Sequence, residues 1–497
     1  MTENKPITLS PTSRRMVLKG ATAGLGALAL SGIAPLHFVR GAWAEDYKPI
    51  GNFPARTSGS TIKFGFVVPQ TGAYADEGAD ELRSYDLAVK HLNEGGGLLQ
   101  TLKPSNLKGN GILGKKVEFV TGDTQTKPDT AREVGQRMIE RDGVIMFSGG
   151  SSSAEAVAQQ YLAQEKGVIF MCALTHSNDT TGKDRRRYGF RHFFNAYMSG
   201  IALGPIIAEA YGKDRRRYGF RHFFNAYMSG IALGPILAEA YGKDRRAYHL
   251  TADYTWGHTQ YSSIKNATEE QGWATVNNIM TPLGAPDFSQ FLTAALNSDA
   301  DVVVLNHYGK DMINSLTQAV QFGMRDMQKN GKDMQVVVPL YSELMAKGAG
   351  DNIEGVIGTT NWNDKLEDEG TKTFVKAFTE AHGSPPSQAA HTAYVQTLLY
   401  ANAVETAGTF YPPEVIKALE GFEFEGVAPN KHVYRADDHQ CFHDILVVQG
   451  KAPSARADEY DLLQIVRQVP REEVTYDPKI DAFGGPQAEL GPYEPAA

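Results

Sequence analysis

Cysteine is nearly absent from this chain of 497 residues, which holds only Cys172 and Cys441. Two cysteines can form neither a disulfide framework nor a thiolate zinc site. One disulfide and two separate buried thiols are the alternatives that stay open, and the second is favoured. Positive charge is also in deficit, because 49 Lys and Arg against 57 Asp and Glu give a net charge of −8. A role in nucleic-acid binding is therefore not expected, since it requires a basic face that neutralises phosphates.

Motifs of the common catalytic mechanisms are lacking as well. None of the 13 histidines belongs to an H-E-x-x-H pair, no G-x-S-x-G is present, and no Cys–His spacing suggests a thiol protease. We therefore expect no catalytic residue, no metal and no cofactor. His432, His439 and His443 lie close together in the sequence, but structural or surface roles are favoured over a metal site. The neighbouring pair Asp437 and Asp438 is interpreted as solvated loop charges.

A glycine-rich segment at 109–115 (GNGILGK) matches G-x-G-x-x-G and half of a phosphate-binding loop. A phosphate loop follows a strand and opens a helix, so that helix amides point at the phosphate. Here a strand-like segment follows instead, and position 116 is Lys rather than the Ser or Thr that would bind magnesium. The segment is therefore predicted to be a turn and not a nucleotide site.

Long apolar runs are missing except near the N-terminus. Residues 13–19 (SRRMVLK) are close to the twin-arginine export pattern, the uncharged stretch 20–39 follows, and Ala42-Trp43-Ala44 forms an A-x-A cleavage site. Five glycines or prolines in that stretch favour a cleaved signal over a retained membrane anchor. Residues 1–44 are thus predicted to be a signal peptide that sends the mature chain to the periplasm.

Beyond this signal, strand-like and helix-like segments alternate. Apolar runs predict strands at 62–69, 116–121, 144–147, 167–174, 247–252, 274–280 and 301–306. Segments with helical spacing lie at 82–93, 128–140, 262–271 and 288–296, and a further helix is expected after 151–153. The alternation predicts an α/β fold with mostly parallel sheets, and its two successive runs predict two doubly wound lobes. A last strand is expected after about residue 451, and 471–497 is predicted to be a terminal tail.

Residues 183–212 and 213–242 form a tandem repeat in which 29 of 30 positions are identical. Solenoid repeats diverge and need three or more copies, so this pair is interpreted as a recent duplication. We expect the fold to need only one strand-like and one helix-like piece of the unit. The second helix is favoured as the native one, because it leads directly into the strand at 247–252. The alternative, that both copies are structurally required, stays open.

The segment Gly149-Gly150-Ser151-Ser152-Ser153 lies after an apolar strand and before a helix. Ligands of open α/β sheets bind at this edge, where strands end and helices begin. Small residues allow a ligand to approach the backbone, and serine hydroxyls with free helix amides suit an anionic or carbonyl oxygen. An ordinary serine cap is the alternative. Thr175 ends the next strand and would lie beside this segment.

Several segments between 62 and 451 occur in an informative order. They are IKFGFVVPQTGAYADEG, AVKHLNEGGG, GILGKKVEFVTGDTQTKPDTA, GGSSSAEAVA, DYTWG, APDFS, GDNIEGV and HTAYVQTLLYANAVETAG. In this order they resemble the extracytoplasmic solute-binding proteins of ABC importers, in the type I class that includes the leucine/isoleucine/valine-binding proteins. The resemblance implies two lobes joined by three hinge crossovers that close on a ligand. It implies a first lobe of 62–194 with 362–430 and a second lobe of 225–361 with 431–470, and it places the repeat at the first crossover.

The resemblance also implies a ligand site between the lobes. The first lobe would supply Tyr74, Ala75, Ser151, Ser152, Ser153, Ala173 and Thr175. The second lobe would supply Trp256, Tyr341 and the segment Asn306-His307-Tyr308, and Tyr394 matches an aromatic residue near the hinge.

One departure from the family pattern concerns the ligand. Amino-acid binders of this group place an acid for the ligand ammonium after a strand and a proline, and alignment on Pro339 puts Leu340 at that position. Glu343 could substitute if the loop shifts. A buried ammonium without a partner is costly, so an amide, a urea-like molecule or a carboxylic acid fits as well as an α-amino acid.

The resulting hypothesis is an exported receptor that delivers a small polar molecule to the permease subunits of an ABC importer and performs no chemistry. A periplasmic sensor that acts through a signalling partner would share the same pocket and differ in its partner. A periplasmic enzyme is a third alternative, because the twin-arginine route exports folded proteins.

Overall fold

The computed structural model describes residues 57–196, 198, 244–270, 272–475, 489–491 and 493. The chain divides into the units Met1–Lys48 and Pro49–Ala497, and the description below concerns the second unit by itself. The predicted signal peptide at 1–44 lies outside the described residues. The same holds for all of the second repeat copy, for most of the first copy after residue 196, and for most of the predicted tail at 471–497.

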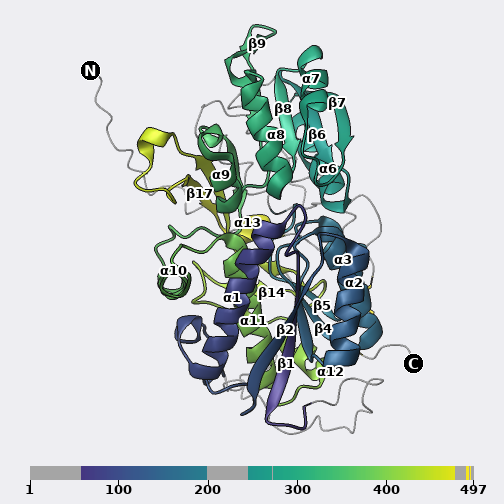
Figure 1. Cartoon of the computed structure of the whole chain (residues 1–497), viewed down its shortest axis with the longest axis vertical. Helices are drawn as coiled ribbons and strands as arrows, with labels where there is room; N and C mark the ends of the chain where they lie inside the picture. The colour runs from purple at the N-terminus through teal and green to yellow at the C-terminus, as the bar shows by residue number, and fades with distance from the viewer. Residues whose placement is uncertain are drawn as a thin grey trace, which may run out of the picture. The chain divides into compact units, whose positions relative to one another are not determined.

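A five-stranded parallel sheet is formed in the order β2-β1-β3-β4-β5. Its strands are β1 (Thr61–Val68), β2 (Lys116–Asp123), β3 (Met146–Gly149), β4 (Ile169–Cys172) and β5 (Gly189–Arg191). Helix α1 (Ala75–Glu94) packs with α11 (Gln388–Ala407) on one side of this sheet, and α2 (Pro128–Arg137) packs with α3 (Ser153–Lys166) on the other (Figure 1). The predicted parallel sheet with helices on both faces is confirmed for this part of the chain.

A second parallel sheet has the order β11-β8-β6-β7. Its strands are β6 (Arg246–Ala252), β7 (Ala274–Thr281), β8 (Val302–Asn306) and β11 (Gln335–Val337). Its helices are α6 (Thr255–Glu270), α7 (Ser289–Asn297), α8 (Gly309–Gln321) and α9 (Glu343–Ala349). These elements occupy the upper part of Figure 1. Two α/β lobes are therefore present, as the alternation of the sequence predicts.

The C-terminal third adds strands that run antiparallel. Strands β12 (Ile357–Thr360), β16 (Ile445–Gly450) and β17 (Leu463–Val469) form one sheet, and β13 (Glu423–Phe424), β14 (His432–Tyr434) and β15 (Cys441–Phe442) form another. The remaining helices are α10 (Glu369–His382), α12 (Pro412–Leu419) and the short α13 (Arg471–Val474). The strand expected after residue 451 is β17. Helix α11 contacts α1, β3 and β4, so the chain returns from the second sheet to the first.

Local sequence accounts for several element boundaries. The segment at 109–115 is a turn rather than a phosphate loop: Gly109, Gly111 and Gly114 all have positive φ, and Ile112 pairs with Lys115 directly before β2. Positive φ is readily adopted by glycine, which lacks Cβ. Helix α3 ends at Gly167 in the left-handed conformation, a common helix stop.

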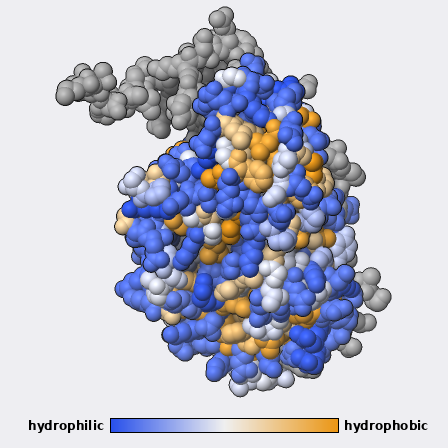
Figure 2. All heavy atoms as spheres, turned by 45° about the horizontal axis from the view of Figure 1, so that its top comes forward, coloured by the Kyte–Doolittle hydropathy of each residue, from blue (hydrophilic) through white to orange (hydrophobic). Residues whose placement is uncertain are grey.

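Burial agrees with the interior expected for such sheets. All residues of β3, β4, β5 and β8 are buried, as expected for strands covered on both faces. Cys172 and Cys441 are both buried and unbonded, so the two-thiol alternative is the one observed. Figure 2 shows a face on which hydrophilic residues surround smaller apolar areas. Among the described helices, none combines the length and apolar character needed to cross a membrane.

Candidate functional site

The carboxyl edge of the first sheet carries a network centred on the Ser153 hydroxyl. The Thr175 hydroxyl donates to Ser153 Oγ at 2.8 Å, and the backbone N–H groups of His176 and Ser177 donate to it at 3.3 and 3.1 Å. Ser153 begins α3, and Thr175 lies three residues beyond Cys172, where β4 ends. The sequence therefore brings these two hydroxyls together as expected, and they bond to each other.

Buried carboxyl groups lie behind this network. The Ser151 hydroxyl donates to both oxygens of Glu81 at 3.1 Å, and the Ser152 backbone N–H donates to Glu155 at 3.0 Å. Burial raises the pKa of Glu155 to about 7 and that of Glu81 well above its usual range, because a charged carboxylate loses hydration there. The serine segment is thus backed by acids that hold protons more strongly than usual.

An aromatic cluster faces this edge from both lobes. Tyr74 precedes α1 in the first lobe, Tyr254 and Trp256 lie around the start of α6, and Tyr308 directly precedes α8 in the second lobe. The Tyr74 and Tyr254 hydroxyls are 2.6 Å apart, and the Tyr74 and Tyr308 ring centroids are separated by 5.6 Å. Trp256 lies 5.8 Å from Tyr254 and 6.3 Å from Tyr308 between ring centroids. Four aromatic side chains from the two lobes therefore meet.

Polar contacts also join the two lobes. Trp256 Nε1 donates to His176 Nδ1 at 2.7 Å. The Thr255 hydroxyl donates to Asp179 at 2.6 Å and lies 3.2 Å from the Ser177 hydroxyl. All of these first-lobe partners lie in the segment after β4, and both second-lobe partners open α6. The two lobes are thus in direct contact along this edge.

Two acidic side chains act on the hydroxyls of the aromatic cluster. Asp311 and Glu77 both raise the pKa of the Tyr74 and Tyr254 hydroxyls, beyond the larger effect of burial. Burial raises the pKa of Glu77 to about 8 and that of Asp311 to about 7. At neutral pH these carboxyls therefore hold protons for much of the time, which lowers the cost of enclosing them.

The sequence profile of the periplasmic binding protein family matches residues 61–216 and 208–457. The chain belongs to this family. The two matched pieces overlap at 208–216, where the first repeat copy gives way to the second. The resemblance to type I solute-binding proteins is thereby confirmed.

Known proteins similar to this periplasmic binding protein agree with that assignment. A Leu/Ile/Val-binding protein homolog 8 from Brucella abortus is 22% identical over 369 residues, which are 73% of this chain and 80% of the relative. A periplasmic binding protein from Burkholderia mallei has a structure similar to this one, with a TM-score of 0.69, 21% identity, and coverage of 84% of this chain and 96% of that chain. A solute binding protein of an ABC transporter from Rhodopseudomonas palustris, solved with 3,4-dihydroxy benzoic acid, has a TM-score of 0.65, 21% identity, and coverage of 83% and 98%. These structural similarities show the fold.

Most of the residues expected at the ligand site of this periplasmic binding protein lie at the edge where the lobes meet. They are Tyr74, Ala75, Ser151, Ser152, Ser153, Ala173, Thr175, Trp256 and Tyr308. All are buried except Ala75, which is half-buried. Tyr308 additionally accepts a hydrogen bond from Gln388 Nε2 at 3.3 Å, so the start of α11 reaches the same place.

The other three expected residues have their contacts elsewhere. His307 is held inside the second lobe, 3.0 Å from the Thr281 hydroxyl and 2.9 Å from the Ser315 hydroxyl. Tyr341 is buried against β12, where its backbone N–H donates to Thr359 O. Tyr394 bonds His91 near the end of α1. None of these contacts involves the cluster around Trp256.

Several residues at this edge escaped prediction. They are Glu77, His176, Asp179, Tyr254 and Thr255. Tyr254 and Thr255 belong to the DYTWG segment that singled out Trp256, and His176 directly follows Thr175. Residues next to them in the sequence were therefore identified, but which side chains reach this edge depends on long-range packing.

Leu340, which occupies the position of the acid in amino-acid binders, and Glu343, its possible substitute as an ammonium partner, are both at least partly enclosed. Leu340 is buried and pairs with Thr359. One oxygen of Glu343 accepts from Asn363 at 2.9 Å, and burial raises the pKa of this carboxyl to about 8. Glu343 is therefore mainly protonated at neutral pH in this structure.

The expectations for the histidines and the acidic pair are met only in part. His432 and His443 are buried, and so is His439, which lies 2.8 Å from Glu420, so these histidines are structural.

Asp438 is only 1% exposed and accepts a hydrogen bond from Arg435 Nε at 2.9 Å. Its interpretation as a solvated charge is wrong, because this ion pair brings it inside. Within the described part of the chain, no group of three acidic, histidine or cysteine side chains is arranged to hold a metal.

Proposed function

We propose that this periplasmic binding protein is an exported solute receptor of an ABC importer, which captures a small polar organic molecule between its lobes and performs no chemistry on it. The supporting observation is the meeting of Trp256 from the second lobe with His176 from the first, at the edge where ligands of parallel α/β sheets bind. Aromatic rings with a few convergent hydroxyls and amides are typical of small-molecule sites. The family membership supports the same role.

The lobe boundaries follow from this proposal. Residues 62–194 with 362–430 would form the lobe around the first sheet, and 225–361 with 431–470 the lobe around the second. The connections after β5, β12 and β13 would then be the three crossovers about which the lobes rotate. Such hinge closure assembles a ligand site from residues of both lobes.

The ligand class that we favour is a small amide or carboxylic acid, with branched-chain amino acids as the main competitor. Glu343 is the nearest acid in the sequence to Leu340, the position where amino-acid binders hold the ligand ammonium, and burial raises its pKa to about 8. The homologue from Brucella is called a Leu/Ile/Val-binding protein, whereas the neighbour from Rhodopseudomonas was solved with an aromatic acid. Both ligand classes are therefore represented among similar proteins.

A thermal-shift screen tests this proposal most directly. The mature protein would be heated with leucine, acetamide, urea, benzoate and 3,4-dihydroxybenzoate, each at several concentrations. A true ligand stabilises by about 2.7 kcal/mol at a hundredfold excess over its dissociation constant. Stabilisation by an amide or acid supports the proposal. Tight binding of leucine in calorimetry that is lost in Glu343→Ala would overturn the preference for ligands without an amine.

The role of the partner and the route of export need separate tests. Pull-down of permease subunits by the ligand-loaded protein would support the receptor role, whereas capture of a sensor kinase would favour the signalling alternative. Replacing Arg14 and Arg15 with Lys should abolish export if residues 1–44 are a twin-arginine signal. Continued export of that variant would contradict this route.

A further inference from the structure

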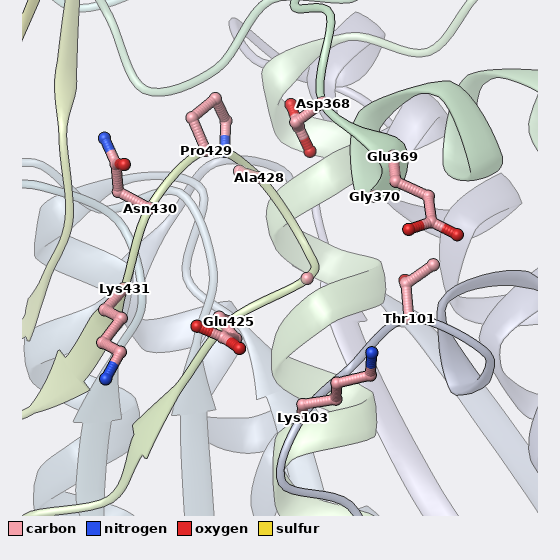
Figure 3. Close-up of a pocket in the computed structure, with 11 residues that line it drawn as sticks. Thr101, Lys103, Asp368, Glu369, Gly370, Glu425, Ala428, Pro429, Asn430 and Lys431 are labelled. Carbon is pink, nitrogen blue, oxygen red and sulfur yellow. The ribbon is translucent and has the colours of Figure 1, made fainter.

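A cavity lies away from the aromatic cluster between the lobes. Its volume is about 490 Å³, and it is formed where the segment after α1, the start of α10 and the segment from β13 to β14 come together (Figure 3). This volume is in the range of small-molecule sites. None of the residues proposed for the ligand site between the lobes lines it.

Close backbone contacts build the wall of this cavity. A Cβ on Gly426 would lie 2.0 Å from Thr101 O, and a Cβ on Gly370 would lie 2.4 Å from Gly426 O. Lys103 and Glu425 exchange backbone hydrogen bonds of 3.0 and 2.8 Å. Three segments that are distant in the sequence are therefore held rigidly together, so the side chains on the rim project from a fixed frame.

The rim carries charges of both signs that do not neutralise one another. Lys103 and Lys431 are exposed and make no ion pair with any described residue. Glu369 and Glu425 line the same cavity and likewise form no ion pair within the described ranges. In the view of Figure 3 the two lysines lie on the lower side with Glu425 between them, and Glu369 lies with Asp368 on the upper side. Unpaired opposite charges across one cavity complement a molecule that itself carries both charges.

Two further polar atoms at this cavity lack partners. Thr101 is 7% exposed, and its hydroxyl makes no hydrogen bond in the described part of the chain. One oxygen of Asp368 accepts from the Thr371 backbone N–H at 2.9 Å, while the other is buried without a partner. Buried polar atoms are nearly always hydrogen-bonded in folded proteins, so these two sites call for a group that the protein itself does not supply.

We propose that this cavity is a binding site for a small zwitterion, such as a free amino acid or a short peptide with both termini charged. The ligand carboxylate lies toward Lys103 and Lys431, and its ammonium lies toward Asp368 and Glu369. Affinity is modest, because exposed ion pairs are screened by water and salt. The site is distinct from the one between the lobes and does not depend on the proposed transport role.

Glycylglycine is a suitable probe, with N-acetylglycine and glycinamide as matched molecules that carry only one of the two charges. Saturation-transfer NMR on the full mature protein gives the dissociation constant of each. We expect glycylglycine to bind at least fivefold more tightly than either relative. Lys103→Met and Glu369→Gln should each weaken glycylglycine at least fivefold, and Lys108→Met, an exposed lysine outside the cavity, should not.

The variant Trp256→Phe separates this site from the one between the lobes. Undiminished binding of glycylglycine by Trp256→Phe, together with its loss in Lys103→Met, supports the proposal. Binding that depends on Trp256 and not on Lys103 would place the peptide between the lobes and overturn the second site while leaving the transport role intact. The second site would also be overturned if N-acetylglycine bound as tightly as glycylglycine, or if glycylglycine did not bind at all.

Discussion

The indole N–H of Trp256 donates to Nδ1 of His176 at 2.7 Å, so that one hydrogen bond joins the second lobe to the first. Nδ1 can accept this bond only while it carries no proton. Burial, together with the positive charge of Arg191, lowers the pKa of His176 well below its usual range. The imidazole is therefore neutral, and the contact depends on that protonation state.

Removing the indole donor should favour separation of the lobes. Trp256→Phe keeps an aromatic ring but leaves His176 Nδ1 without its donor, and a hydrogen bond of this kind contributes about 1 kcal/mol. We expect about a fivefold shift toward open forms, which small-angle scattering of the unliganded protein would detect as a larger radius of gyration. Trp273→Phe, which changes a buried tryptophan remote from this contact, is the control. Identical scattering by wild type and Trp256→Phe would contradict the role of this bond.

Glu343 should make stability depend on pH in the neutral range. Its pKa is raised to about 8 by burial, with a smaller effect of Asp364, whereas an unfolded glutamate titrates near pH 4.3. The folded state therefore binds more protons between these values, so this group's contribution to stability is complete below about pH 4.3 and is lost as the pH rises to about 8.

The variant Glu343→Gln should remove this loss of stability at higher pH, because glutamine does not titrate. Urea unfolding should show the variant to be more stable than wild type at pH 8 and similar to it at pH 4.5. Glu354→Gln, which alters an exposed glutamate, should leave the difference between the two pH values unchanged. A wild-type advantage at pH 8 would mean that the Glu343 carboxylate is charged and paired in the folded protein.

A cluster of four buried histidines should act in the opposite direction on acidification. His192, His391, His432 and His443 are stacked or tilted against one another, with ring centroids 5.4 to 6.5 Å apart. Burial lowers the pKa of His391 to about 3 and the pKa values of the others below their usual range. The unfolded chain binds protons near pH 6.5 while the folded cluster does not, so stability should fall as the pH drops below about 6.5.

His432→Phe tests this cluster with a ring of similar shape. Neither ring nitrogen of His432 makes a hydrogen bond of normal geometry within the described chain, and an unsatisfied buried group costs about 1–3 kcal/mol. The variant should be more stable than wild type at pH 7, and its unfolding midpoint in urea should fall less between pH 7 and pH 5. A steeper fall than in wild type would show that the imidazole of His432 is protonated or bonded in the folded state.

Local patterns predicted the parts of the fold that are governed by local chemistry. The apolar run before Gly149 and the serines after it predicted β3, α3 and their shared edge, because strand burial and helix capping involve neighbours in sequence. The antiparallel sheet of β12, β16 and β17 was not predicted, because β12 and β16 are remote in the sequence. The burial of Asp438 was not predicted either: its partner Arg435 lies only three residues away, but burial of the carboxylate depends on tertiary packing. The same reason explains why Trp256 was identified whereas its partner His176 was not: the bond spans 80 residues.

The tandem repeat offers a final prediction, which concerns the number of copies rather than their identity. Strand β5 comes from the first copy, Gly189–Arg191, and its Arg191 donates to Gln440 Oε1 through Nε at 2.8 Å. Strand β6 begins at Arg246, four residues after the last residue of the second copy, Gly242. If the fold uses the strand-like piece of the first copy and the helix-like piece of the second, which leads into β6, it needs the equivalent of one complete unit.

Deleting 213–242 should therefore leave a folded protein with an unchanged or higher melting temperature, because surplus apolar side chains no longer need to be accommodated. Deleting 183–212 instead yields a chain that differs from the first product only by Leu in place of Ile at one position. The two deletion variants should thus behave alike in thermal unfolding, and each serves as the control for the other. Loss of cooperative unfolding in both would show that the two copies are structurally required. Loss of cooperative unfolding in only one variant is not expected, because the two products differ by a single conservative substitution. This pair of variants therefore tests the number of copies without depending on which copy is deleted.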